Sequence, residues 1–228
     1  MSLALFLPVR SGSERVVQKN TRSFAGYKNG IFELKLNQIK DLDEVDQTII
    51  SSNDEKCLEI ATSFKDKIKN LVIDERPEHL GNASTKLEDL ITHASKINNC
   101  DHVLWTHATN PLFFSTNYKA AIKQYYDQLS NGYDSLVSGY LMKEFLIDPE
   151  NNEIINNKTD LKWPRTQDLA ELFSINNAVF LADSERYKMG DRIGVNPFYL
   201  VNDKVASLDI DYEEDFLISE AVYEKLNK

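Results

Sequence analysis

The stretch LALFLPVRSGSERVVQKNTR, residues 3–22, passes directly from an apolar run into a loop rich in Arg and Lys. Leu3 to Val9 has the length and the continuous hydrophobicity of a strand that is buried on both faces of a parallel sheet. Gly12 permits a tight turn shortly after that strand. The stretch therefore predicts a central strand whose carboxyl end opens into a ligand-binding loop, as in open α/β sheets.

Strand-like runs and segments of helical period alternate through most of the remaining chain. Apolar residues recur at helical spacing over residues 87–97, after Thr85, which with Glu88 has the spacing of a capping box. The same period returns over residues 118–129 and 217–222. Further strands are expected at residues 46–51, 71–73, 102–105, 135–137, 178–181, 198–201 and 205–208. This alternation predicts an α/β fold with a doubly wound, mainly parallel sheet.

The chain length favours one substantial domain, and we interpret residues 1–228 as that domain. Residues 138–172 interrupt the alternation, since they include the Asn-rich run DPENNEIINNKTD. This segment carries scattered apolar residues and has no core of its own to bury them. We therefore expect an inserted arm that contacts another molecule.

The composition excludes several classes of protein. The chain has 26 Lys and Arg against 36 Asp and Glu, a formal net charge of −10, which argues against binding nucleic acid or anionic membrane by bulk electrostatics. No apolar run has the length of a membrane span or the flanks of a signal peptide. Cys57 and Cys100 lie far apart without a zinc-binding pattern, which fits a reduced, cytoplasmic setting.

Positive charge is concentrated in the loop that follows the first strand. Arg10, Arg15, Lys19 and Arg22 accompany a single acid, Glu14, in a protein whose net charge is negative. Such a loop suits a polyphosphate, because Arg and Lys supply charge-assisted hydrogen bonds and a glycine turn can aim backbone N–H groups at an anion. The loop matches neither the Walker A sequence nor GxGxxG. A solvated basic loop explains the same composition.

A run of acids, LDIDYEED, occupies residues 208–215. Asp209 and Asp211 alternate along an extended backbone, so their carboxylates project to one side and could share a divalent cation. The same residues allow a second interpretation. Asp211 and Glu214 have the spacing of a capping box, and acids in the first turn of a helix are favoured by its macrodipole.

Taken together, these regions resemble the acylneuraminate cytidylyltransferase family, the CMP-sialic acid synthetases and their relatives. The resemblance covers nearly the whole chain, and its first and last motifs are the specific ones. The motifs that carry it are LPVRSGSERVVQKNTRSFAG (residues 7–26) with the pair Lys19-Asn20, IISSNDE (49–55), Arg76-Pro77, Thr109 to Leu112, Asp134 to Ser138, NNAVFLA (176–182) and DIDYEED (209–215).

The resemblance implies a Rossmann-like nucleotidyltransferase fold. It also implies transfer of CMP from CTP to the anomeric hydroxyl of a nonulosonic, sialic acid-like sugar, with release of pyrophosphate. The metal would be Mg²⁺, with Mn²⁺ as the other option, and residues 138–172 would form a homodimer.

The same resemblance assigns residues to these roles. Catalysis falls to Arg10, Lys19, Asp209 and Asp211, the two aspartates being the metal ligands. The nucleotide would be held by Arg10, Ser13, Arg15, Lys19, Asn20, Arg76 and Ser84. The sugar would be held by His107, Thr109, Asn110, Arg165 and Asn177. Arg165 would bind the sugar carboxylate, in its own or in the neighbouring subunit's site.

Three positions depart from the family pattern. Glu14-Arg15 replaces a Lys-Gly pair, so Arg15 takes the part of a phosphate-binding lysine. The run HATNPLF, residues 107–113, replaces Gln-Pro-Thr-Ser-Pro-Leu-Arg near the sugar, and Asn177 replaces a glycine.

Several alternatives therefore stay open. One is a nucleotidyltransferase for another acid sugar, of the eight-carbon Kdo type, or for a sugar phosphate. Another is a non-catalytic protein that binds a nucleotide sugar. Two of the assigned residues also have plainer explanations, since Arg165 fits a surface arginine on a polar loop and His107 fits a hydrogen-bonded histidine at a strand end.

Overall fold

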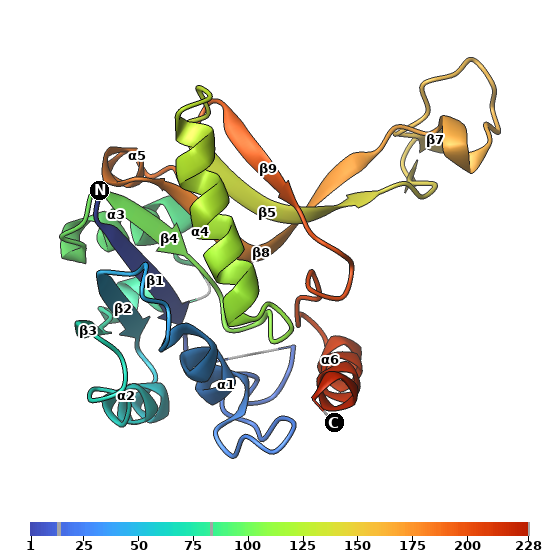
Figure 1. Ribbon diagram of the computed structural model, residues 1–228. Coiled ribbons are helices and arrows are strands. Elements are labelled where there is room, and N and C mark those ends of the chain that lie inside the picture. The colour runs from blue at the N-terminus through green and yellow to red at the C-terminus, as the bar shows by residue number, and fades with distance from the viewer. Residues whose placement is uncertain (13–14, 83, 228) are drawn as a thin grey trace.

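The computed structural model describes residues 1–12, 15–82 and 84–227. Its main feature is a seven-stranded sheet with the strand order β3-β2-β1-β4-β8-β5-β9 (Figure 1). The strands are β1 (Leu3–Val9), β2 (Gln47–Ser52), β3 (Leu71–Glu75), β4 (His102–Trp105), β5 (Ser135–Met142), β8 (Leu172–Asp183) and β9 (Pro197–Val201). Neighbouring strands pair in parallel except β8, which runs antiparallel to both β4 and β5. The predicted mainly parallel sheet is confirmed.

Helices cover both faces of this sheet. One face packs against α1 (Gly30–Ile39), α2 (Glu55–Thr62), α4 (Ser115–Leu129) and α6 (Glu213–Leu226), and the other against α3 (Leu87–Ile97) and α5 (Ser184–Lys188). No helix in the described ranges is long and apolar enough to cross a membrane.

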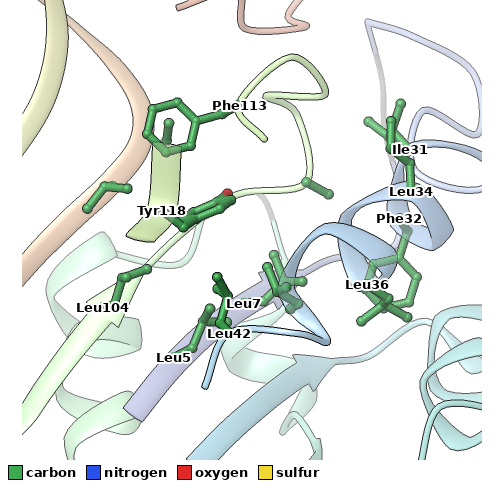
Figure 2. Packing of buried hydrophobic residues seen from close by; sticks show 14 of the residues in the cluster. Leu5, Leu7, Ile31, Phe32, Leu34, Leu36, Leu42, Leu104, Phe113 and Tyr118 are labelled. Carbon is green, nitrogen blue, oxygen red and sulfur yellow. The ribbon is translucent and has the colours of Figure 1, made fainter. Parts of the chain in front are cut away.

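β1 supplies side chains to the hydrophobic cores on both faces of the sheet. Leu3, Leu5 and Leu7 enter the first core, whereas Ala4 and Phe6 enter the second. Figure 2 shows two of these leucines among the residues of the first core. The continuous apolar run of this strand follows from its burial on both faces.

The order of the strands reverses between β1 and β4. From β1 the chain moves outward to β2 and β3, and then crosses to β4 on the other side of β1. A crevice forms at the carboxyl ends of two strands where the order reverses in this way. β1 ends at Val9, next to the basic loop, and β4 ends at Trp105, next to residues 107–110. The topology thus brings two segments singled out from the sequence to one place.

Two local expectations are wrong, and a third is incomplete. Residues 205–208 form a turn instead of a strand, because the Asp203 carboxylate accepts a hydrogen bond at 2.8 Å from the backbone N–H three residues later. The Thr85 capping box does not form, since the Thr85 hydroxyl donates to the His79 carbonyl at 2.9 Å and α3 begins two residues later. The strand expected at residues 178–181 is longer because its first half pairs with the end of β5.

Residues 138–172 form an arm that projects from the sheet (Figure 1). β5 and β8 continue into it as an antiparallel ribbon, and β6 (Ile147–Asp148) pairs with β7 (Glu153–Ile154) in a short hairpin beyond. Asn156 is 2% exposed and donates to the carbonyls of Glu144 and Ala170, which holds the two sides of the arm together. Large apolar side chains of the arm remain exposed: Leu141, Phe145, Ile147, Ile155, Leu161 and Trp163.

Candidate functional site

A cleft of about 330 Å³ lies at the carboxyl ends of β1 and β4. Its walls come from these strand ends, from the basic loop and from the start of α3. The residues that line it are Pro8, Val9, Arg10, Arg15, Val16, Lys19, Asn20, Arg76, Leu87, Leu90, Trp105, His107, Ala108 and Thr109. The structure therefore brings together most of the side chains expected to hold the nucleotide and two of those expected to hold the sugar.

The basic loop is attached to the acidic segment, residues 209–215. Lys19 Nζ donates to the Ile210 carbonyl at 2.7 Å, and Arg15 forms an ion pair of 2.7 Å with Asp211. Burial lowers the pKa of Lys19, and the nearby charges of Asp211 and Asp209 oppose that change. The loop and the acidic segment thus form one continuous surface beside the cleft.

Asp209 is the more enclosed of the two acids expected to bind metal. Its Oδ2 accepts a hydrogen bond from the Asn177 amide at 2.8 Å, whereas its Oδ1 is buried and bonds to nothing in the described part of the chain. Burial raises the pKa of this carboxyl, and the Asn177 amide and the Thr109 hydroxyl oppose the rise. A buried carboxylate oxygen without a partner is costly and marks a place for a cation.

Asp211 is not the N-cap of the last helix. The N-cap position of α6 belongs to Tyr212, and Asp215 Oδ2 accepts hydrogen bonds from the backbone N–H groups of Asp211 and Tyr212 at 3.0 and 2.8 Å. Asp215 therefore provides the capping that the sequence pattern assigned to the pair Asp211 and Glu214. The Asp211 carboxylate is directed to Arg15 instead.

Asp209 and Asp211 fit a hard divalent cation. They offer carboxylate oxygens two residues apart, and one of these oxygens has no other partner. Over residues 1–12, 15–82 and 84–227, no three His, Cys, Asp or Glu side chains come together as a metal site. Mg²⁺ does not need three such side chains, because proteins commonly bind it through one or two carboxylates, with waters and substrate phosphates as the other ligands. The donor set therefore fits a metal that binds together with a polyphosphate.

The backbone at Asn177 explains why this residue can replace a glycine. Its φ is 59°, in the left-handed region that glycine adopts most easily and that Asn tolerates better than most residues. The side chain also donates to Asp209. The asparagine thus adopts the backbone conformation that glycine would adopt, and it adds a hydrogen bond to the Asp209 carboxylate.

His107 is held between Trp105 and an arginine that sequence reasoning missed. Trp105 Nε1 donates to His107 Nε2 at 2.8 Å, and Arg192 Nη1 approaches the same nitrogen at 3.5 Å. Because Nε2 meets donors from both residues, we assign the ring proton to Nδ1. Desolvation lowers the pKa of His107 to about 3, with help from the Arg192 charge, so the ring is neutral. The sequence feature that could have pointed to Arg192 is the run GDRIG, residues 190–194, in which two glycines flank the arginine.

Arg76 lines the cleft from the end of β3. Its guanidinium is buried and donates to the hydroxyl and carbonyl oxygens of Ser51. Burial lowers the pKa of Arg76 to about 10. Ser84 is not among the cleft-lining residues of the described chain, and its hydroxyl donates to Asn82 at 2.7 Å. Ser13, also expected to bind the nucleotide, lies outside the described residues.

Three residues expected at the sugar site do not line the described cleft: Asn177, whose amide bonds to Asp209, Asn110 and Arg165. Asn110 is buried, and its amide donates to the carbonyls of Asn176 and Leu208 at 2.6 and 3.3 Å. It thereby positions the segment after β4. Arg165 lies on the arm, where it binds Asp168 through contacts of 2.7 and 3.0 Å. Within one chain, the structure does not bring Arg165 to the cleft.

The model of the Cytidylyltransferase family matches residues 4–228. The chain belongs to this family. The match includes the cleft, the acidic segment and the arm, and the expected enzyme class, a nucleotidyltransferase, is confirmed. The family assignment covers cytidylyltransferases in general and does not single out the acylneuraminate branch.

No curated protein matches this cytidylyltransferase in sequence. Its structure is similar to that of CMP:2-keto-3-deoxy-manno-octonic acid synthetase complexed with CTP, with a TM-score of 0.68 and 8% identity, covering 99% of this chain and 100% of that chain. It is also similar to 4-diphosphocytidyl-2C-methyl-D-erythritol synthase from Anaerococcus prevotii DSM 20548, with a TM-score of 0.67, 12% identity and 98% of each chain covered. At such identities the similarity shows a shared fold.

Proposed function

We propose that this cytidylyltransferase joins CMP from CTP to the anomeric hydroxyl of an acidic keto-sugar, a nonulosonic or sialic acid-like acid, and releases pyrophosphate. One observation carries the proposal. Arg15 and Lys19 line the cleft and, at the same time, bind the acidic segment that contains Asp209. The cleft thus combines charge for a polyphosphate with ligands for a divalent cation. The similarity to a synthetase complexed with CTP supports CTP as the nucleotide.

In this proposal Arg10, Arg15 and Lys19 bind the triphosphate, while Asn20 and Arg76 bind the cytidine end. The sugar hydroxyl oxygen attacks the α-phosphorus and loses its proton to water, and the bond from that phosphorus to the bridging oxygen of the β-phosphate breaks. Negative charge grows on the departing pyrophosphate. Cations that are already in position stabilise this charge, so alignment and electrostatics supply most of the catalysis.

The pair Arg15 and Asp211 gives the site an exchangeable contact. Their side chains are 53% and 46% exposed and 2.7 Å apart, so the ion pair is weak. A phosphate can replace the carboxylate on Arg15, which leaves Asp211 and Asp209 available for Mg²⁺ or Mn²⁺. When bound there, the metal would neutralise phosphate charge and lower the pKa of the attacking hydroxyl.

An eight-carbon acid of the Kdo type is the second candidate acceptor. The similarity to the 2-keto-3-deoxy-manno-octonic acid synthetase favours it. Both classes of acid place an anomeric hydroxyl beside a carboxylate, so the same loop and the same acids serve either one. A sugar phosphate is a third class of acceptor, and the family assignment argues against a protein that binds nucleotide sugars without catalysis.

A pyrophosphate-release assay tests the proposed function. Each of the four ribonucleoside triphosphates is combined with N-acetylneuraminic acid, Kdo or 2C-methyl-D-erythritol 4-phosphate in the presence of Mg²⁺. The expected result is release with CTP and one of the two acids, and none with either substrate alone. Release with another triphosphate, or with the phosphate acceptor alone among the three, contradicts the proposal.

We also propose that the arm forms a homodimer, because its exposed apolar side chains need a partner. Deleting residues 145–162 is expected to give monomers with little activity, whereas Lys158→Ala, a polar change in the same segment, should keep the dimer. Light scattering measures the mass of each form. A monomeric wild-type protein would contradict this proposal.

A further inference from the structure

Arg192 stands beside the cleft in an aromatic setting. Its guanidinium carbon lies 3.7 Å from the centre of the Phe180 ring and 5.0 Å from the centre of the Trp105 ring. It also approaches His107 at 3.5 Å. Trp105 and His107 both line the cleft. Arg192 is not itself among the residues that line the described cleft, but it contacts two of those that do, Trp105 and His107.

No carboxylate of the described chain pairs with this arginine. Burial lowers the pKa of Arg192 to about 10, and an arginine so desolvated usually has an anionic partner. Its Nε and Nη2 donate to no described residue, and neither of these two nitrogens is sealed from solvent. The guanidinium thus keeps donors available to a ligand.

Several cations lie near His107. The charges that lower its pKa come from Arg192, Lys19, Lys35 and Arg76, and no acid is among these causes. This local excess of cations occurs in a chain whose formal net charge is −10. Cations gathered in a partly enclosed cleft attract an anionic ligand.

The loop that carries Arg192 is rigidly held. Asp134 accepts hydrogen bonds from the backbone N–H groups of Val195 and Asn196 at 2.8 and 3.1 Å, and it pairs with Arg186 at 2.9 Å. Asp191 accepts hydrogen bonds from the backbone N–H groups of Ile193 and Gly194 at 3.0 and 3.2 Å. At Gly194 φ is 82°, and a Cβ would clash with Asp134. The loop is therefore built to place its arginine, as a preorganised binding site requires.

The position of Arg192 separates it from the phosphate-binding cations. Arg10, Arg15 and Lys19 belong to the loop after β1, and Arg15 and Lys19 bind the acidic segment. Arg192 lies over β4 and β8, next to residues 107–109, which follow β4. We call the first group the loop wall and the group Trp105, His107 and Arg192 the arginine wall. Two cationic walls suit two anionic substrates.

We propose that Arg192 binds the carboxylate of the acceptor sugar, as a residue that determines specificity for acids. This inference rests on the proposed function and assigns to Arg192 the contact that the sequence suggested for Arg165. The planar guanidinium can donate two parallel hydrogen bonds to a carboxylate while one face stays on the Phe180 ring.

The test compares Arg192→Met and Arg192→Lys with the wild type. Initial rates are measured at saturating CTP against N-acetylneuraminic acid or Kdo, whichever the wild type uses, and against the methyl ester of the same sugar. Arg192→Met should raise the KM for the acid about 10- to 150-fold, since a charge-assisted contact is lost. Arg192→Lys should recover part of the loss, and the KM for the uncharged ester should change little in either variant. Lys188→Met, which removes an exposed charge from the same segment, should leave all values unchanged.

Each other outcome overturns the inference. An equal loss for acid and ester would make Arg192 a structural residue, and a fall in CTP affinity measured by calorimetry would move it to the nucleotide. An unchanged KM for the acid in Arg192→Met would remove it from the site while leaving the proposed function intact. A wild type that binds CTP but neither acid, by turnover or by Trp105 fluorescence in a Trp163→Phe background, would overturn the proposed function and this inference together.

Discussion

On the loop wall of the cleft, Lys19 and Arg15 are each bound to the acidic segment at 2.7 Å, whereas on the arginine wall no described carboxylate pairs with Arg192. On the loop wall, the charges of Lys19 and Arg15 are already paired with groups of the protein. A ligand that binds these side chains must therefore displace those groups. The arginine wall is held by aromatic rings and keeps its charge unbalanced. The same residue type thus serves an exchangeable contact on one side and a preorganised contact on the other.

The largest expected effect lies at the acidic segment, which supports the loop wall. Asp209→Asn and Asp211→Asn should each lower turnover about 100-fold or more, because a metal ligand supplies several kcal/mol of transition-state stabilisation. Without metal, the Tm of Asp209→Asn should stay close to that of the wild type or rise, since burial already disfavours the Asp209 charge. Rates across a Mg²⁺ titration should show partial recovery at high Mg²⁺ in at least one variant. Wild-type turnover in both variants would refute the metal role.

A smaller effect, on the affinity for CTP, is expected when a cation of the loop wall is replaced. Arg10→Ala or Lys19→Ala should weaken CTP binding about 10- to 150-fold, the usual range for one charge-assisted contact. Arg22→Ala is the matched control, because Arg22 belongs to the same loop but binds Glu213 at 2.8 and 3.0 Å and does not line the described cleft. Calorimetric CTP titrations compare the three variants. Equal affinities in all three would restore the interpretation of a solvated basic loop.

The smallest effect concerns the pH dependence of stability at the arginine wall. The pKa of His107 is about 3 in the folded protein against an ordinary value of 6.5. Between these values the unfolded chain takes up a proton that the folded chain does not, so the free energy of unfolding falls as the pH falls from 6.5 towards 3.

His107→Gln should make that decline shallower, and His79→Gln, at an exposed histidine, should not. Urea unfolding at several pH values measures the slope. His102, whose pKa burial also lowers, should maintain part of the decline in both variants. Identical slopes in the wild type and His107→Gln would show that the arginine wall does not hold this ring neutral.

Local sequence patterns were sufficient for the class of the sheet and for the position of the basic loop at the end of its first strand. The continuous apolar run from Leu3 to Val9 can be buried on both faces only in a central strand. The basic residues that follow it therefore lie at the carboxyl end of that strand. The acids at 209–215 were equally visible, because an alternation of charged residues is a property of neighbouring positions. These features depend on residues a few positions apart, which is the range over which patterns carry physical meaning.

Tertiary structure decided the partners. Nothing local indicates that Arg15 meets Asp211, or that Arg192 meets His107 across 85 positions of sequence. Arg165 lies on the arm, as its position within residues 138–172 implied, and within one chain the fold pairs it with Asp168 and does not bring it to the cleft. Side chains far apart in the chain meet only because the sheet orders its strands as β1-β4-β8. The same packing determines which buried or half-buried cations pair with an acid of the protein and which keep their charge for a ligand.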